Sequence, residues 1–101
     1  MGLTPAYEER CTARRSLALG FFGTFMSLRI SFYDNFVVLA SILRRIIPYE
    51  SVELVEYKQL FVLMGLVIHT RNPHRIFALF PREPKKMLEL FSGKGVRVSS
   101  T

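Results

Sequence analysis

Apolar residues occupy every second position from Leu28 to Phe32, and both positions between them are polar. A period of two predicts a strand with one buried face. Asp34 and Asn35 follow, and both residue types tolerate the backbone conformations of a tight hairpin turn. The apolar, β-branched residues 36–43 therefore predict a second strand that runs back along the first.

Three further apolar segments are also predicted as strands. Residues 51–59 alternate imperfectly, and residues 60–68 form a dense apolar run that contains Gly65. An isolated glycine in a strand often marks a bulge. Residues 76–80 are the last segment of this kind, so the pattern gives five strands in sequence.

Polar segments are expected to connect these strands. Arg44 and Arg45 end the second strand on one loop, and the polar residues 70–75, which include an Asn-Pro pair, form another turn. Pro48 suits an extended start to the next strand, where no backbone donor is required. Short polar connections of this kind favour an antiparallel sheet.

The hydrophobic period changes after residue 83. Pro84 suits the first turn of a helix, four apolar residues between positions 87 and 91 form one stripe, and Gly93 favours the end. A helix this short is stable only when it docks on another element. The predicted fold class is therefore mostly β with one C-terminal α-helix, in which the helix caps a curled antiparallel sheet or half-open barrel.

Composition divides the chain near Met26. The first 25 residues contain neither valine nor isoleucine, whereas the rest is rich in both. Because β-branched residues favour strands, residues 26–101 are predicted as the domain. Residues 1–25 are interpreted as a poorly defined leader that is disordered, packed on the domain or not native.

The apolar residues 17–28 follow Arg14 and Arg15, a pattern similar to an export signal. The uncharged stretches of the chain are shorter than the ~18–20 residues that a membrane-spanning helix requires. A cytoplasmic protein is therefore expected, with shallow membrane insertion or export through this segment as the alternative.

Charge and composition exclude several classes of chemistry. Fourteen lysines and arginines oppose eight acidic residues, for a net charge of +6, and residues 58–101 carry the excess. One cysteine and two histidines are too few for a cysteine-clustered zinc site or a disulfide framework. No nucleophilic triad or phosphate-binding glycine loop is present. We expect no enzyme, no catalytic residue, no metal, no cofactor and no small-molecule substrate.

Eight basic side chains are the candidate residues for binding an anion or a partner. Arg44 and Arg45 share one predicted loop and Arg71 and Arg75 share another, so a fold that joins the loops would create an anion site. The alternative is that these arginines are simply solvated. A second basic cluster surrounds the predicted helix and would suit nucleic acid or an acidic membrane. It comprises Arg82, Lys85, Lys86 and Lys94, with Arg97 close in sequence.

Three motifs in the same order resemble bacterial pleckstrin-homology-like (PH-like) domains. Residues 46–52, Ile-Ile-Pro-Tyr-Glu-Ser-Val, are similar to the opening strand "I-P-Y-x-x-I", and residues 65–70 resemble a glycine-led fourth strand. Residues 80–90 resemble the last strand and its "P-x-x-P" helix start, and residues 95–98 the closing segment. The resemblance covers about residues 28–98.

This resemblance implies a non-enzymatic interaction module. Several bacterial PH-like domains form homo-oligomers, so a homo-oligomer and an unidentified protein partner are expected, with an acidic membrane surface or nucleic acid as alternatives. Eukaryotic relatives hold phosphoinositides through basic residues of the first hairpin loop. The predicted first loop here, Tyr33-Asp34-Asn35, is acidic, so no residue of that pattern carries over.

Overall fold

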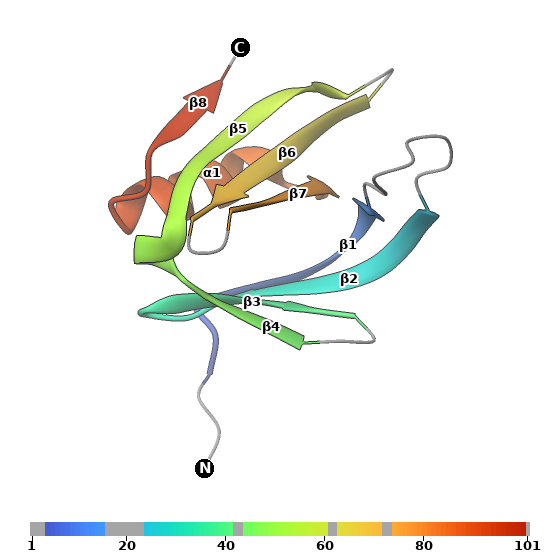
Figure 1. Cartoon of the computed structure of the whole chain (residues 1–101). Coiled ribbons are helices and arrows are strands. Elements are labelled where there is room, and N and C mark those ends of the chain that lie inside the picture. Colours follow the sequence, from blue (N-terminus) through green and yellow to red (C-terminus); the bar gives the residue numbers. More distant parts are fainter. Residues whose placement is uncertain (1–3, 16–23, 42–43, 61–62, 72–73, 101) are drawn as a thin grey trace.

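Eight strands and one α-helix make up the described part of the chain (Figure 1). The computed structural model describes residues 4–15, 24–41, 44–60, 63–71 and 74–100. The elements in chain order are β1 (Tyr7–Arg15), β2 (Thr24–Phe32), β3 (Phe36–Ala40), β4 (Arg44–Pro48), the 3-10 turn η1 (Tyr49–Ser51), β5 (Val52–Leu60), β6 (Leu63–Thr70), β7 (Arg75–Phe80), α1 (Pro84–Gly93) and β8 (Val98–Ser100).

All eight strands belong to one open, curled sheet in the order β4-β3-β2-β1-β7-β6-β5-β8. Every neighbouring pair is antiparallel except β5 and β8, which are parallel. The helix α1 lies behind β5 and β6 in the view of Figure 1. The expected fold class, mostly β with one helix near the C-terminus, is confirmed at this level.

The central strand β1 corrects the expected division of the chain at Met26. Tyr7–Arg15 pairs along its whole length with β2 and also pairs with the end of β7. Cys11 in this strand is only 7% exposed and belongs to the core. Interpreting residues 1–25 as a leader is therefore wrong for these nine residues, while residues 16–23 lie outside the described residues.

Because β1 precedes β2, the turn at residues 33–35 follows the second strand of the sheet and not the first. Tyr33-Asp34-Asn35 connects β2 to β3, where the Tyr33 N–H donates to the Phe36 carbonyl at 2.9 Å. The expected turn is confirmed, but it is the second hairpin of the sheet rather than the first. The loop compared with the phosphoinositide-binding loop of eukaryotic PH-like domains is therefore not the first connection of this sheet. The first connection contains residues 16–23, which the structure does not describe.

Two other expected strand limits are wrong. Arg44 and Arg45 begin β4 instead of forming a loop, because they pair with the last residues of β3. The apolar residues 60–68 are not one strand, since Leu60 pairs with Leu63 across the β5–β6 hairpin. The end of β5 and the start of β6 are both apolar, so the sequence contains no polar residue that would indicate where one strand ends and the next begins.

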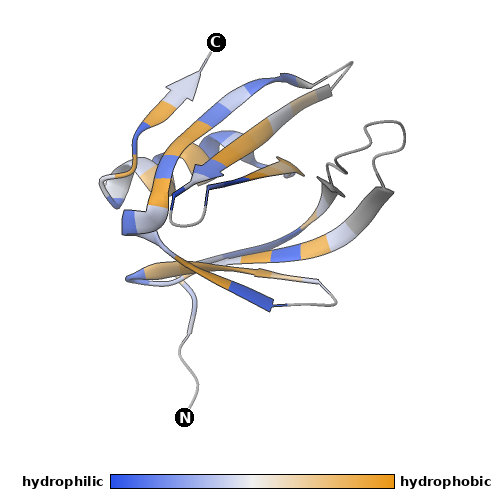
Figure 2. Cartoon of the chain, in the orientation of Figure 1, coloured by the Kyte–Doolittle hydropathy of each residue, from blue (hydrophilic) through white to orange (hydrophobic). Residues whose placement is uncertain are grey.

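The helix begins and ends where the sequence predicts. Pro84 is its first residue and Gly93 its last. The residue with left-handed backbone (φ +81°), which prevents the helix from continuing, is Gly95. Met87 and Phe91 on its inner face are fully buried. Figure 2 shows long hydrophobic stretches on β3, β6 and β7, whereas β4 begins with a strongly hydrophilic stretch.

The buried thiol of Cys11 predicts a loss of stability at alkaline pH. Burial, assisted by the charge of Glu9, raises the pKa of Cys11 from 9.0 to about 12. The unfolded chain therefore loses this proton first, so the thiol's contribution to stability is complete below pH 9 and disappears as pH rises toward about 12. Urea unfolding across this range should show wild type losing free energy relative to Cys11→Val. A difference that stays constant with pH would contradict the prediction.

Candidate functional site

Four arginines from two distant parts of the sequence line one pocket beside β4. Arg44 and Arg45 are the first residues of β4, whereas Arg71 and Arg75 belong to the β6–β7 hairpin. The pocket has a volume of about 370 Å³, and we call it the arginine pocket. The rest of its lining comprises Ile46, Ile47, Pro48, Ser51, Thr70 and Phe77.

The curvature of the sheet brings these arginines together. Three strands separate β4 from β7 in the sheet order. Neighbouring strands lie ~4.8 Å apart, so a flat sheet would hold β4 and β7 roughly 19 Å from each other. The curled sheet instead places residues of both strands around one pocket, with η1 connecting β4 to the second half of the fold.

Backbone hydrogen bonds fix the hairpin that carries Arg71 and Arg75. The Arg71 N–H donates to the Ser51 carbonyl at 2.8 Å, which ties the hairpin to η1. Across the hairpin, the Arg75 N–H donates to Thr70 Oγ1 at 3.2 Å, and the Thr70 hydroxyl donates to the Arg75 carbonyl at 3.4 Å. These bonds position both arginines through their main chain and leave the guanidinium groups available for a ligand.

The electrostatics of the arginine pocket favour an anion. A guanidinium group remains charged at any physiological pH, and no carboxylate in the described ranges lies within ion-pair distance of these four. Arg45 instead lies over the Phe77 ring, 5.9 Å from its centroid. Four like charges repel one another across the pocket, and an oxyanion bound between them would relieve that repulsion.

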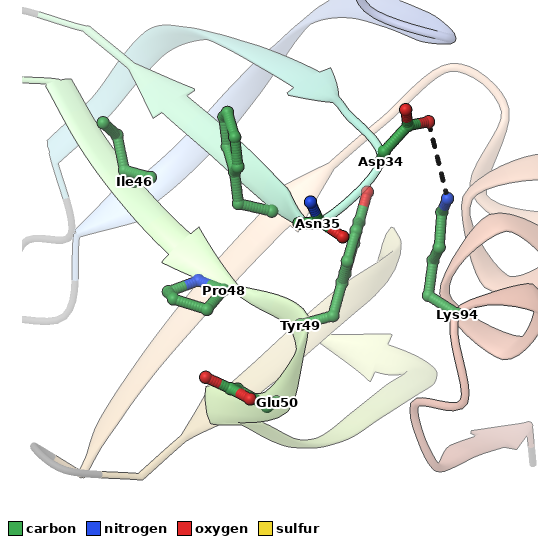
Figure 3. Close-up of a pocket in the computed structure, with 8 residues that line it drawn as sticks. Asp34, Asn35, Ile46, Pro48, Tyr49, Glu50 and Lys94 are labelled. Atoms are coloured by element: carbon green, nitrogen blue, oxygen red, sulfur yellow. Dashed lines mark ion pairs between the residues drawn. The ribbon is translucent and has the colours of Figure 1, made fainter.

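A second pocket surrounds the β2–β3 turn and the end of β4 (Figure 3). Its volume is about 480 Å³, and we call it the turn pocket. Asp34 and Glu50 contribute negative charge, and Lys94 Nζ lies 4.0 Å from Asp34 Oδ1. This mixed charge makes the turn pocket a weaker anion site than the arginine pocket. Its complete lining is Asp34, Asn35, Phe36, Ile46, Pro48, Tyr49, Glu50 and Lys94.

The structure does not bring the second basic cluster into one site. Arg82, Lys85 and Lys86 are exposed around the first turn of α1, whereas Lys94 follows its last residue. A ten-residue helix is ~15 Å long, so Lys94 lies far from the other three along the helix axis. Lys86 Nζ lies 4.6 Å from the centroid of the Tyr7 ring. Of the candidate groups, only the arginines of the two predicted loops converge.

The sequence analysis missed the buried carboxylate of Glu9, because residues 1–25 were interpreted as a leader. Glu9 accepts hydrogen bonds from the Arg82 N–H at 2.5 Å, the Tyr7 hydroxyl at 2.7 Å and the Glu83 N–H at 3.3 Å. Burial and this carboxylate raise the pKa of Tyr7 above its usual range. The contacts assign Glu9 a structural role in fixing the turn from β7 to α1.

Glu56 and His69 form a second polar pair. Glu56 is half-buried, and its Oε1 lies 2.6 Å from His69 Nε2. The pair joins neighbouring strands β5 and β6 and lies outside the lining of both pockets.

The apolar segment considered for membrane insertion is partly integrated in the sheet. Residues 24–28 belong to β2, where Leu28 is buried in the core, and the residues before them lie outside the described ranges. Within the described ranges, the length and apolarity that crossing a membrane requires are not reached by any helix. Insertion of residues 17–28 into a membrane stays a prediction.

Comparisons with known proteins do not assign this chain to a family. No protein-family model matches the sequence, and no curated protein matches it. The resemblance of residues 46–52, 65–70 and 80–90 to PH-like domains accordingly stays a prediction.

Proposed function

We propose that this chain is a non-enzymatic, PH-like interaction module that binds an anionic group of a protein partner in the arginine pocket. The observation that carries the proposal is the convergence of two arginine pairs, 44–45 and 71–75, on one pocket. The open, curled sheet and the helix that starts at Pro84 support the PH-like part, because the resemblance implies both features.

The chemistry of arginine indicates which ligand groups fit. Its planar fork donates two parallel hydrogen bonds to a phosphate or a carboxylate. A volume of about 370 Å³ exceeds the space of a single oxyanion, so the pocket has room for a group that is part of a larger ligand. An anionic group presented on a partner protein meets both requirements.

Charge reversal in the arginine pocket should strongly weaken anion binding. We expect Arg71→Glu/Arg75→Glu to weaken the binding of inorganic pyrophosphate by about a hundredfold, because two charge-assisted hydrogen-bonding groups are lost and two repulsive charges are added. The matched control is Arg82→Glu/Arg97→Glu, which changes the net charge equally but outside the pocket. Titration calorimetry of the full chain with pyrophosphate measures both.

Three outcomes of this titration decide the proposal. Loss of binding in the pocket variant alone supports it. Loss in the control variant alone would favour the alternative of polyanion or nucleic-acid binding beside α1. Failure of the wild-type chain to bind pyrophosphate at low salt would contradict anion recognition, because electrostatic binding is strongest there.

The homo-oligomer, the acidic membrane surface and the cytoplasmic location stay predictions. The exposed Ile76 side chain is apolar surface that self-association would cover. Sedimentation of the full chain tests the oligomer. Co-sedimentation with vesicles rich in phosphatidylserine, using the same two double variants, tests whether the arginine pocket also contacts anionic lipid.

A further inference from the structure

The strand β4 forms an open edge of the sheet. It stands first in the strand order, and among the strands that the structure describes it pairs only with β3. The arginine pocket and the turn pocket both include Ile46 and Pro48 in their linings, so both pockets border this strand. Ile46, at the centre of the strand, is 61% exposed. An edge of this kind offers unpaired backbone groups to an added strand.

The register shows which backbone groups of β4 face outward. The Tyr49 N–H donates to the Asn35 carbonyl at 3.3 Å, and this pair continues the register of β3 and β4. Hydrogen-bonded and non-hydrogen-bonded pairs alternate along antiparallel strands. Arg45 and Ile47 therefore bond to β3, whereas Ile46 directs its N–H and C=O away from the sheet.

Side chains of β4 alternate in the same way. Ile47 is buried, and Arg45 on the same face lies over Phe77 in the arginine pocket. The neighbouring position, Ile46, presents its apolar side chain on the opposite face. A strand added beside β4 would thus place alternate side chains next to Arg45 and the others next to Ile46, with Arg44 at one end of the Ile46 face.

We infer that β4 binds an extended acidic segment of a partner protein as an additional strand. Acidic side chains at every second position would enter the arginine pocket, and apolar side chains between them would cover Ile46. This inference rests on the proposed anion-binding function and adds the conformation and side-chain pattern of the ligand. Since β4 has five residues, the docked part spans about five residues, or roughly 17 Å.

Charge favours an acidic segment over a second copy of this chain at the same edge. The chain carries a net charge of +6. Pairing of two β4 strands would add the arginines of one copy to the four of the other, and like charges so close together oppose association. An acidic segment instead neutralises the arginines while its backbone pairs with β4.

A synthetic peptide with alternating glutamate and valine, capped at both ends, is the probe for strand addition. We expect the full chain to bind it, and Ile46→Pro to bind it about tenfold more weakly, because the proline removes an outward backbone donor. Ile46→Val keeps the donor and is the matched control. Proline is tolerated at an edge position whose N–H does not bond to the sheet, and circular dichroism verifies folding.

Two N-methylated peptides make the test independent of that variant. One carries the methyl groups on its glutamates and the other on its valines, so only one of them loses the donors that face β4. Fluorescence anisotropy with wild-type protein should show about tenfold weaker binding for one peptide and little change for the other. Equal binding of both would overturn strand addition.

Pyrophosphate separates failure of this inference from failure of the proposed function. The wild-type chain should bind pyrophosphate whichever N-methylated peptide it prefers, whereas Arg71→Glu/Arg75→Glu should lose both pyrophosphate and the peptide. Wild-type binding of pyrophosphate without the peptide would overturn strand addition alone. Binding of neither probe would overturn the proposed function as well. A dimer that Ile46→Pro dissociates would show that a second copy occupies the edge, which also overturns the inference.

Discussion

Replacing Phe91 with alanine should lower the free energy of unfolding by about 3–5 kcal/mol. Phe91 is fully buried on the inner face of α1. Its ring lies 5.0 Å from the Phe32 ring and 6.2 Å from the Tyr49 ring, both in edge-to-face geometry. Alanine would leave a cavity between the helix and the sheet. Domains of this size are stable by about 5–15 kcal/mol, so the variant should be close to unfolding.

The matched control for Phe91 is Glu89→Ala on the exposed face of the same helix. Exposed substitutions of this kind change the free energy of unfolding by about 0.5 kcal/mol or less. Urea unfolding followed by circular dichroism compares the two variants with wild type. A loss below about 1 kcal/mol for Phe91→Ala would mean that the docking of α1 contributes little to the fold.

The same contact links the core to the candidate site. Phe91 packs against Tyr49, whose hydroxyl donates to the Tyr33 carbonyl at 2.7 Å. Tyr49 begins η1, and Ser51 at the end of η1 accepts the hydrogen bond from the Arg71 backbone. Docking of the helix therefore supports the turn that positions half of the arginine pocket.

Local sequence signals predicted the elements whose limits are set by neighbouring residues. The alternation before Asp34 predicted the inner face of β2, and Pro84 with the apolar stripe predicted α1. Thr70 and Arg75 bracket the turn that the polar residues between them indicate. In each case the determining interactions lie within a few residues along the chain, so a pattern read along the sequence contains them.

Elements that depend on distant contacts were not predictable in this way. The strand β1 places Glu9 on its inner face, and a charged residue at a buried position departs from the pattern of a strand with one apolar face. That position becomes understandable only when the N–H groups of Arg82 and Glu83, more than seventy residues away, are known to bond to it. Sequence alone could not reveal this pairing.

The candidate site was predictable as a set of residue types and only partly as a place. Two arginine pairs on polar segments suggested an anion site if their loops met. The convergence of the two arginine pairs depends on the curvature of the sheet and on β1, which joins β2 to β7 in the strand order. Lys94 is the opposite case, in which proximity in sequence does not predict proximity in space. It lies near the other basic residues in sequence, but its side chain approaches Asp34.

Replacing Glu9 with alanine should lower the free energy of unfolding by about 2–5 kcal/mol, because it removes a buried carboxylate that accepts from several donors at once. The Arg82 and Glu83 N–H groups and the Tyr7 hydroxyl all donate to this carboxylate, which is only 8% exposed. Alanine leaves the two N–H groups without this acceptor at the turn that leads into α1, while the Tyr7 hydroxyl keeps Glu83 Oε2 within 3.3 Å.

Glu9→Gln separates the hydrogen bonds from the packing of the side chain. Glutamine has the same shape and retains one acceptor oxygen, so its loss should be clearly smaller than that of alanine. Amide hydrogen exchange at Arg82 and Glu83 should accelerate in Glu9→Ala more than in Glu9→Gln. Amides of β3 that exchange by local opening, and not by global unfolding, should exchange at rates close to wild type. Equal, small losses in both variants would show that the turn forms without this carboxylate. The reason to expect otherwise is geometric, since Glu9 lies on the central strand and its acceptor oxygens are the contacts that fix where the chain leaves β7 and the helix begins.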